Sequence, residues 1–523
     1  MKKTYLLPIF LVFLIITGLA AQFYISIKKT GLSHDGAITY LAASGKQIDY
    51  SKNISNVAGH WMPVIKIKKF FYNDNFFNFG EIKEGLVKTD IHPPLYFWLV
   101  HIAVWLFGFS IICAPLINFI CLALTLGVIY IFVKQNTEDR ITSLLAVAIL
   151  CISPVCFDIT NISRQYALFM LLSIILIVAA YKSITTYKSQ AIWWFAAVFA
   201  ACILGLLTHY YFILVITAVF LAAFVTLRTC IIKMSLLASS MFTGVAVFFL
   251  LMPGILEQFG RQQHQKEPFS LASISSRLDH SIDIFSYYFG WHPWWPSSAA
   301  VLLAFLIFSF LFLINRKKSA QQAEVDDVDG ISKRFARYMH YVLIFSVAPV
   351  LVLYVFQFVS EHAMASRYLA PLAPTIAIVT AIALRNVSVR IPLLIMCLSA
   401  FLAVNNYSLA KNSSVSFDKY KAFKSAHHIV IDNLARGVAL RELPYLDERQ
   451  MVFLDWRCDL KEEMEKWASA LTAGDVVVLN DAYKNSSCDR EAFLEKLRAE
   501  VKIKKVDKDA FLVVKQDVYA AER

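Results

Sequence analysis

Residues 165–181 read QYALFMLLSIILIVAAY and contain no Asp, Glu, Lys or Arg. A helix needs about 20 predominantly apolar residues to cross the hydrocarbon core of a membrane, so this stretch nearly suffices for one span. The chain contains twelve apolar stretches of this kind, and several of them are shorter. They fall near residues 5–27, 93–109, 111–133, 141–157, 165–181, 191–208, 211–227, 234–253, 298–315, 339–359, 369–384 and 391–405. This pattern predicts a polytopic α-helical membrane protein with about 11–13 transmembrane helices.

The composition of the 523 residues agrees with a membrane protein. Apolar residues make up 58% and charged residues 17%, whereas soluble domains have about 45–50% and about 25%. These values exclude a disordered chain and argue against a soluble enzyme. Residues 406–523 contain 20 basic and 20 acidic residues, so the net charge of +12 lies entirely in the apolar part. No basic cluster is interleaved with aromatic residues, so nucleic acid is not an expected partner.

The basic residues predict which segments lie on each side of the membrane. Lys2 and Lys3 precede the first apolar stretch, and a basic cluster occupies residues 316–337, so both are expected in the cytoplasm. We interpret the first stretch as a retained anchor, with a cleaved signal peptide as the alternative. The segments expected outside are the loops 28–92, 254–297 and 360–368 and the tail 406–523. Because this arrangement needs an odd number of crossings, one of the twelve stretches is re-entrant, or two form one helix, between residues 93 and 227.

The tail 406–523 has a different pattern from residues 1–405. Apolar β-rich runs at 451–456, 475–480 and 511–516 alternate with helical stretches near 417–435, 459–472 and 489–499. This alternation predicts a small α/β domain. Cys458 and Cys488 are the only cysteines in the tail, and they either form a disulfide in an oxidising compartment or remain two separate thiols. No Cys/His spacing indicates a zinc site.

Asp35 is the first candidate functional residue. It lies in GLSHDGAITYLAASG (31–45), just after the first apolar stretch and at the start of an amphipathic helical pattern. A carboxylate at the membrane–water boundary can act as a base or as a metal ligand. The alternative is a structural role as the N-cap of the helix, where Asp is favoured.

The segment TDIHPPLYFW (89–98) follows at the end of the same loop. Pro93 and Pro94 suit the first turn of a helix, where no hydrogen-bond donor is lost. Asp90 and His92 would then lie at a helix N-terminus, which attracts anions such as phosphate. The alternative is an interfacial turn with a solvated histidine.

Three further motifs fall at the outer ends of apolar stretches. They are SRQYAL (163–168), THYY (208–211) and SRYLAPLAP (366–374). Their candidate residues are Arg164, Tyr166, His209, Arg367 and Tyr368. An arginine at the end of a span can bind phosphate, or it can extend to the interface without a ligand. The aromatic residues could equally form an interfacial belt.

Taken in this order, the motifs resemble those of the GT-C membrane glycosyltransferases. The most similar groups are the protein O-mannosyltransferases and the lipid A aminoarabinose transferases. The resemblance covers roughly residues 1–405 and rests on Asp35, HPPLYFW (92–98), SRQYAL, THYY and RYLAPLAP (367–374). HPPL followed by an aromatic residue is its most specific part. The family usually has further acidic residues where this chain has Gly36 and Ile162, so Asp35 remains the sole carboxylate at its motif position.

The resemblance implies a function. It implies a polyprenyl-phosphate-linked sugar donor, from which a monosaccharide passes to a lipid, glycan or protein acceptor at the outer face of a membrane. The expected membrane is the inner membrane of a bacterium, with the tail in the periplasm. Asp35 is expected to deprotonate the acceptor, Arg164, Arg367 and His92 to stabilise the phosphate, and the sugar carbon to invert. The other residues expected to bind substrate are Asp90, Tyr166, His209 and Tyr368. The resemblance leaves open whether a divalent metal ion also binds.

Two other classes of function remain as alternatives. A transporter or flippase would place ionisable residues at mid-membrane and often shows repeat symmetry, and neither feature is visible in the sequence. A non-catalytic membrane protein whose tail binds a partner would keep the same fold but give Asp35 no role.

Overall fold

The computed structural model describes most of the membrane part and the sheet of the tail. The described residues are 6–27, 32–57, 59–72, 75–186, 188–226, 230–262, 342–356 except 343 and 354, 366–384, 417–432, 442, 446–455, 468–478, 495, 497–498, 502–505 and 510–515. Five sequence expectations lie wholly or mostly outside these residues. They concern the basic cluster of 316–337, most of the loop 254–297, the stretches near 298–315 and 391–405, the helical stretches near 459–472 and 489–499, and the Cys458–Cys488 pair.

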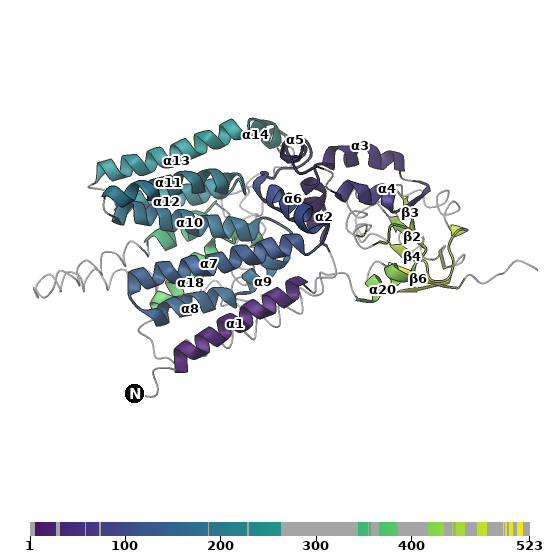
Figure 1. Ribbon diagram of the computed structural model, residues 1–523, viewed down its shortest axis with the longest axis horizontal. Helices are drawn as coiled ribbons and strands as arrows, with labels where there is room; N and C mark the ends of the chain where they lie inside the picture. The colour runs from purple at the N-terminus through teal and green to yellow at the C-terminus, as the bar shows by residue number, and fades with distance from the viewer. Residues whose placement is uncertain are drawn as a thin grey trace, which may run out of the picture.

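A bundle of apolar helices forms the body of the molecule (Figure 1). Its helices are α1 (Leu6–Ile27), α7 (Cys113–Thr137), α10 (Tyr166–Thr185), α11 (Lys188–Leu206), α12 (Phe212–Thr226), α13 (Ile231–Leu251) and α18 (Leu372–Leu384). Within the described residues, α1, α7, α10 and α13 are long and apolar enough to cross a membrane unaided. Large apolar side chains face outward, since Phe13, Phe242 and Leu250 are 60%, 76% and 80% exposed. Lipid tails would cover such surfaces, so the structure confirms a polytopic membrane protein.

The apolar stretch expected over residues 141–157 is two helices instead of one. α8 (Arg140–Cys151) and α9 (Pro154–Asn161) meet at an angle of 55°. Pro154 lies at the first position of α9, where its missing N–H leaves no bond unmade, and the proline ring prevents α8 from continuing. The pair therefore forms a broken span or a re-entrant segment.

Helices of the first loop form a layer between the bundle and the sheet (Figure 1). They are α2 (His34–Ala43), α3 (Gln47–Val57), α4 (Ile65–Lys68), the 3₁₀ turn η2 (Lys69–Phe71), α5 (Phe79–Thr89) and α6 (Leu95–Phe107), and α14 (Ile255–Gln262) packs against α5. We call this end of the bundle the loop end. The first residues of α1 lie at the opposite end.

The apolar stretch 93–109 forms a helix that is too short to cross a membrane unaided. Its helix α6 has 13 residues and therefore rises about 20 Å, less than the ~30 Å of a hydrocarbon core. At its beginning, the Leu95 N–H donates to the carbonyl of Leu207 (2.9 Å). Just beyond its end, the ring of Phe109 packs on Tyr40 and Phe71 of the first loop, with centroids 5.5 and 5.8 Å apart. Both ends of α6 therefore lie at the loop end.

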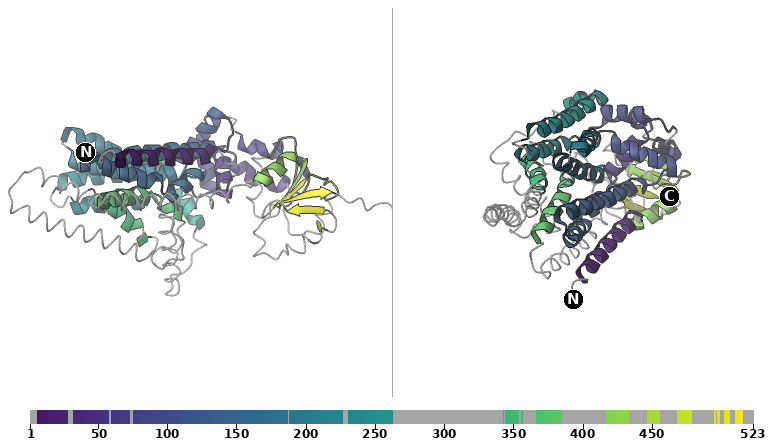
Figure 2. Two further views of the ribbon diagram at one scale, coloured as in Figure 1. Left: turned by 90° about the horizontal axis from the view of Figure 1, so that it is seen from below. Right: turned by 60° about the vertical axis from the view of Figure 1, so that its left-hand side comes forward.

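The tail forms the expected α/β domain, beyond the loop end of the bundle (Figure 2, left). Its sheet has the strand order β1-β3-β2-β4-β6-β5, with β3–β2–β4 parallel and the other neighbours antiparallel. The strands are β1 (Trp61–Pro63), β2 (His428–Asp432), β3 (Met451–Asp455), β4 (Val476–Val478), β5 (Lys502–Lys505) and β6 (Ala510–Lys515). The helix expected over 417–435 ends at Ser425 as α20 (Phe417–Ser425), and β2 follows it. Strand β1 comes from the first loop.

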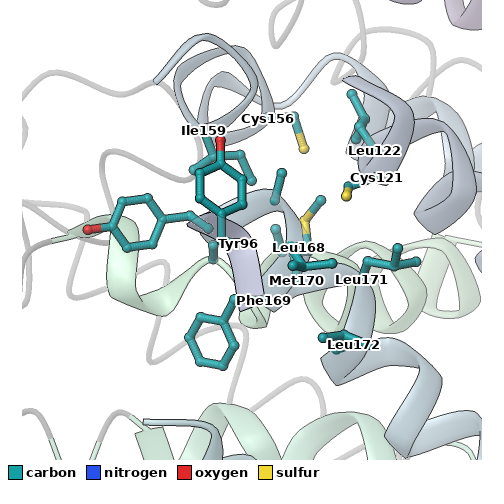
Figure 3. Close-up of a cluster of buried hydrophobic side chains, with 14 of the residues drawn as sticks. Tyr96, Cys121, Leu122, Cys156, Ile159, Leu168, Phe169, Met170, Leu171 and Leu172 are labelled. Atoms are coloured by element: carbon teal, nitrogen blue, oxygen red, sulfur yellow. The ribbon is translucent and has the colours of Figure 1, made fainter. Parts of the chain in front are cut away.

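A core of buried apolar side chains joins the helices nearest the site (Figure 3). The labelled residues are Tyr96 of α6, Cys121 and Leu122 of α7, Cys156 and Ile159 of α9, and Leu168, Phe169, Met170, Leu171 and Leu172 of α10. α10 packs on α7, α11, α12 and α18 and is largely buried along its length. Close packing of this kind fixes where α10 begins, and the candidate site lies at that point.

Candidate active site

Asp35 lies in the first turn of α2 and is not the residue that caps this helix. Ser33 is the N-cap, because its hydroxyl accepts the N–H of Gly36 (3.1 Å). The capping alternative for Asp35 is therefore wrong. Its side chain is 31% exposed and extends toward two arginines instead.

Arg164 and Arg367 hold the two carboxylate oxygens of Asp35. The Nη2 atom of Arg367 donates to Oδ2 (2.8 Å), and Nη2 of Arg164 lies 3.3 Å from Oδ1. Burial alone would raise the pKa of Asp35, but the charges of Arg164 and Arg367 outweigh it, so the pKa lies below its ordinary value. The sequence prediction that these three residues share one site is thus consistent with the geometry. Asp35 is ionised at neutral pH.

Arg164 belongs to a short non-helical segment between α9 and α10. The side-chain amide of Asn118 on α7 donates to the carbonyls of Ile159 (3.2 Å) and Ile162 (2.6 Å), which lose their helical partners at this break. The side chain of Arg164 is only 5% exposed, and among the described residues its Nη1 atom has no hydrogen-bond partner. A buried guanidinium group with an unused donor is suited to binding an anion.

Arg367 approaches from the far end of the chain. It lies in the 3₁₀ turn η4 (Ser366–Leu369), immediately before α18. Its guanidinium group lies 5.6 Å from the centre of the Tyr166 ring, and its Nε atom has no hydrogen-bond partner among the described residues. Arg367 thus carries a second cationic group to Asp35 and retains donors for another ligand.

Asp90 and His92 form a pair at the end of α5. The Oδ1 atom of Asp90 accepts the backbone N–H of Ile91 (2.6 Å) and lies 2.6 Å from Nδ1 of His92. Burial would raise the pKa of Asp90, but His92 and Arg164 lower it well below its usual range. Because an ionised carboxylate only accepts hydrogen bonds, Nδ1 of His92 carries a proton. The field of Arg164 therefore acts on both carboxylates.

Aromatic side chains surround the ion pairs. The ring of His209 lies 5.3 Å from that of Tyr368 and 6.1 Å from that of Tyr166, and the latter two rings are 5.7 Å apart. His209 also stacks on Phe169 (4.8 Å), and its Nδ1 atom accepts the N–H of Tyr211 (3.2 Å). Burial, with a contribution from His92, lowers the pKa of His209 to about 3, so the ring is neutral. Its remaining proton is on Nε2.

Sequence reasoning missed three residues of this site. Tyr211 and Phe169 complete the aromatic cluster, and Gln165 is fully buried beside Arg164. Neither amide atom of Gln165 has a hydrogen-bond partner among the described residues. Tyr211 lies inside the motif THYY and Gln165 inside SRQYAL, so their positions next to His209 and Arg164 in the sequence could have indicated them. The burial of a polar side chain such as that of Gln165, however, cannot be read from the sequence.

The residues around Asp35 do not fit a divalent cation. Both carboxylate oxygens face guanidinium groups, which repel a cation. Within the described part of the chain, no three His, Cys, Asp or Glu side chains cluster closely enough to hold a metal ion. The donor set therefore matches an anionic ligand better than a metal.

The fold agrees with that of known proteins. Residues 91–253 match the family model described as dolichyl-phosphate-mannose-protein mannosyltransferase, and this range contains His92, Arg164 and His209. The structure resembles ArnT from Cupriavidus metallidurans bound to undecaprenyl phosphate, with a TM-score of 0.53 and 11% identity, over 98% of this chain and 99% of that one. For the apo state of the same protein the TM-score is 0.51 at 11% identity, over 96% and 97%. No curated protein matches the chain in sequence.

A helical bundle, a layer of loop helices and a small α/β domain make up the fold, and the chain shares this fold with ArnT over nearly the whole length of both chains. The family match covers residues 91–253 of the bundle and agrees with the resemblance to the GT-C membrane glycosyltransferases that the motifs predicted. The resemblance expected from the motifs is therefore confirmed. The structural likeness, at 11% identity, supports the fold alone.

Proposed function

We propose that this chain transfers a monosaccharide from a polyprenyl phosphate carrier to a lipid, glycan or protein acceptor at the outer face of a bacterial inner membrane. The observation that carries the proposal is the pairing of Asp35 with Arg164 and Arg367, which retain unused donors. One solved protein of the same fold binds undecaprenyl phosphate, and this finding supports the class of donor.

The charges of the site favour a phosphate. Asp35 contributes one negative charge and the two arginines contribute two positive charges, so the cluster keeps a net charge of +1. Arg164 and Arg367 would bind the donor phosphate and stabilise the charge that develops when it leaves. His92, oriented by Asp90 through Nδ1, would add a donor or a positive charge at the same phosphate.

Asp35 would act as the base in the proposed reaction. The acceptor oxygen forms a bond to the anomeric carbon while the bond from this carbon to the phosphate oxygen breaks. The acceptor proton passes to Asp35, and the phosphate leaves with the electron pair, which inverts the sugar carbon. Since phosphate is a good leaving group, no separate acid is needed. The low pKa of Asp35 keeps it in the basic form, and the proton moves late, once the attacking oxygen has become acidic.

The aromatic cluster would hold the sugar or the acceptor. Tyr166, Tyr368 and the neutral His209 offer ring faces and fixed polar atoms next to Asp35. A neutral imidazole ring keeps its hydrogen-bonding pattern over the whole physiological pH range. These residues would therefore determine orientation more than charge.

A transfer assay tests the proposal. The purified protein in lipid nanodiscs is incubated with a panel of undecaprenyl-phosphate-linked monosaccharides and with membrane lipid extracts, and release of undecaprenyl phosphate is followed. We expect release by the wild type, and with Arg367→Gln a loss of about 100-fold or more in rate, the usual scale for one group that stabilises transition-state charge. Binding of undecaprenyl phosphate with no transfer from any donor in the panel would contradict the enzyme assignment.

A further inference from the structure

Strand β1 joins the first loop to the C-terminal sheet. It pairs antiparallel with β3, with Trp61 opposite Phe453 and Pro63 opposite Met451. The contact extends beyond the strand, because the Val64 N–H donates to the carbonyl of Gln450 (2.9 Å). A strand of three residues is not stable alone, so the C-terminal sheet determines where this part of the first loop lies.

Side chains reinforce the backbone pairing. The Trp61 ring packs edge-on against His428 (5.0 Å) and Phe453 (5.6 Å). At the other end of the segment, the Tyr72 hydroxyl donates to the carboxylate of Glu448. The segment from Trp61 to Tyr72 is thus held by the C-terminal domain at both of its ends.

The same segment holds the end of the helix that carries Asp35. The carbonyl of Phe70 in η2 accepts the hydroxyl of Ser44 (2.6 Å), and the carbonyl of Lys69 accepts the Lys46 ammonium (3.0 Å). Ser44 is the C-cap of α2 and is fully buried. Helix α2 therefore ends on chain segments that the C-terminal sheet has positioned.

Helix α2 links these contacts to the candidate active site. Its ten residues span about 15 Å, short enough for a displacement at Ser44 to reach the first turn. The first turn carries Asp35, whose oxygens must meet Arg164 and Arg367. Figure 1 shows α2 between the bundle and the sheet.

We propose that the C-terminal domain is a positioning element for Asp35, acting through β1, Ser44 and α2. The mechanical link follows from the contacts alone, and its catalytic consequence rests on the proposed function. The domain keeps the Asp35 carboxylate at the distance at which it contacts Arg164 and Arg367. Weakening the contact between β1 and the sheet should then loosen α2 while leaving the bundle intact.

Hydrogen–deuterium exchange of the full-length protein in nanodiscs tests the link. Trp61→Ala weakens the contact between β1 and the sheet. Ile503→Ala is the matched control, because Ile503 packs on the same apolar cluster from the opposite edge strand, β5. We expect the α2 amides (34–43) to exchange about tenfold faster in Trp61→Ala, since local opening becomes easier when a supporting contact is lost. With Ile503→Ala their exchange should stay unchanged.

A cysteine pair provides the rescue. Pro63→Cys and Met451→Cys place thiols at facing positions of β1 and β3, and oxidation of this pair in the Trp61→Ala protein should restore slow exchange in α2. If Trp61→Ala does not fold, Tyr72→Phe removes the hydrogen bond to Glu448 and weakens the hold of the C-terminal domain on the other end of the same segment. In the transfer assay, the rate at saturating donor should fall and recover with the exchange, with little change in KM.

The possible outcomes separate the two proposals. Unchanged α2 exchange while the β1 amides exchange faster would overturn the positioning role, and so would an equal effect of Ile503→Ala. Faster α2 exchange that the oxidised pair reverses supports the role even if no variant transfers sugar. In that case the proposed transferase function fails and the positioning link stands.

Discussion

Asp35 carries its charge between Arg164 and Arg367, and this arrangement predicts opposite effects of its removal on binding and on catalysis. With Asp35→Asn, transfer should fall by about 10²–10⁴-fold, because the amide cannot accept the proton of the acceptor. Binding of undecaprenyl phosphate should tighten by roughly tenfold, because a negative charge beside the arginines is gone. Transfer rate and binding of radiolabelled undecaprenyl phosphate measure the two effects.

Asp49→Asn is the matched control for Asp35→Asn. Asp49 is also an acidic residue in the first turn of a helix of the first loop, but it is exposed and belongs to α3. We expect no change in transfer or in binding for this variant. Transfer by Asp35→Asn at the wild-type rate would contradict the base assignment, and Asp90 would be the next carboxylate to change.

The pH dependence of stability follows from the lowered pKa of Asp35. A carboxyl group with a depressed pKa in the folded state stabilises the fold above its unfolded pKa of about 3.9, and this contribution disappears as the pH falls through the folded pKa. Asp35→Asn should therefore lower the Tm by a constant amount between pH 8 and pH 5. The corresponding loss in the free energy of unfolding is about 1.5–3 kcal/mol, the usual value for a charged hydrogen bond, and it should become smaller only below about pH 4. If the difference in Tm between the wild type and Asp35→Asn already disappears between pH 7 and pH 5, a group other than Asp35 controls the pH dependence of stability.

At the scale of elements, Gly205 in the last turn of α11 allows the start of α12 to pack closely against this helix. A Cβ atom on Gly205 would lie 2.3 Å from the ring of Phe212, which is fully buried. Because this ring cannot move aside, Gly205→Ala should destabilise the protein by about 1–3 kcal/mol and displace His209. Thermal unfolding in detergent and binding of undecaprenyl phosphate measure the two consequences.

Gly127 on α7 is the control for Gly205. A Cβ atom there meets nothing within 4 Å, so Gly127→Ala should be neutral or stabilise the helix by up to about 1 kcal/mol. Equal losses of stability at both positions would mean that the effect comes from the helix backbone and not from the Phe212 contact.

Hydropathy found the helices but could not tell which of them cross the membrane. The stretch 93–109 is as apolar as a span, and only the contacts of Leu95 and Phe109 show that both ends of its helix α6 lie at the loop end. Strand β1 escaped prediction because three residues carry no periodicity, and its partner lies far away in the sequence.

The order of motifs along the chain predicted much of the candidate site. Asp35, Arg164 and Arg367 were each named from their motifs. In the structure, each arginine places a guanidinium nitrogen within 3.3 Å of a carboxylate oxygen of Asp35. Motifs at the same end of successive helices converge because the helices pack side by side. The link from the C-terminal sheet to α2 was not predictable, because hydrogen bonds such as that of Ser44 to the Phe70 carbonyl depend on the tertiary fold.

At the scale of the whole molecule, the two ends of the bundle should face opposite sides of the membrane. Glu84 lies on α5 at the loop end, whereas Glu138 follows the last residue of α7, whose 25 residues rise about 37 Å away from the loop end. Lys2 and Lys3 predict that the start of α1 faces the cytoplasm. A membrane-impermeant maleimide applied to intact spheroplasts should therefore label Glu84→Cys and leave Glu138→Cys unlabelled until the membrane is permeabilised. Both variants are made in a protein that carries Cys458→Ser and Cys488→Ser. Labelling of the protein with these two serines alone gives the baseline. Labelling of Glu138→Cys in sealed spheroplasts would reverse the orientation and place Asp35, the arginines and the C-terminal domain in the cytoplasm.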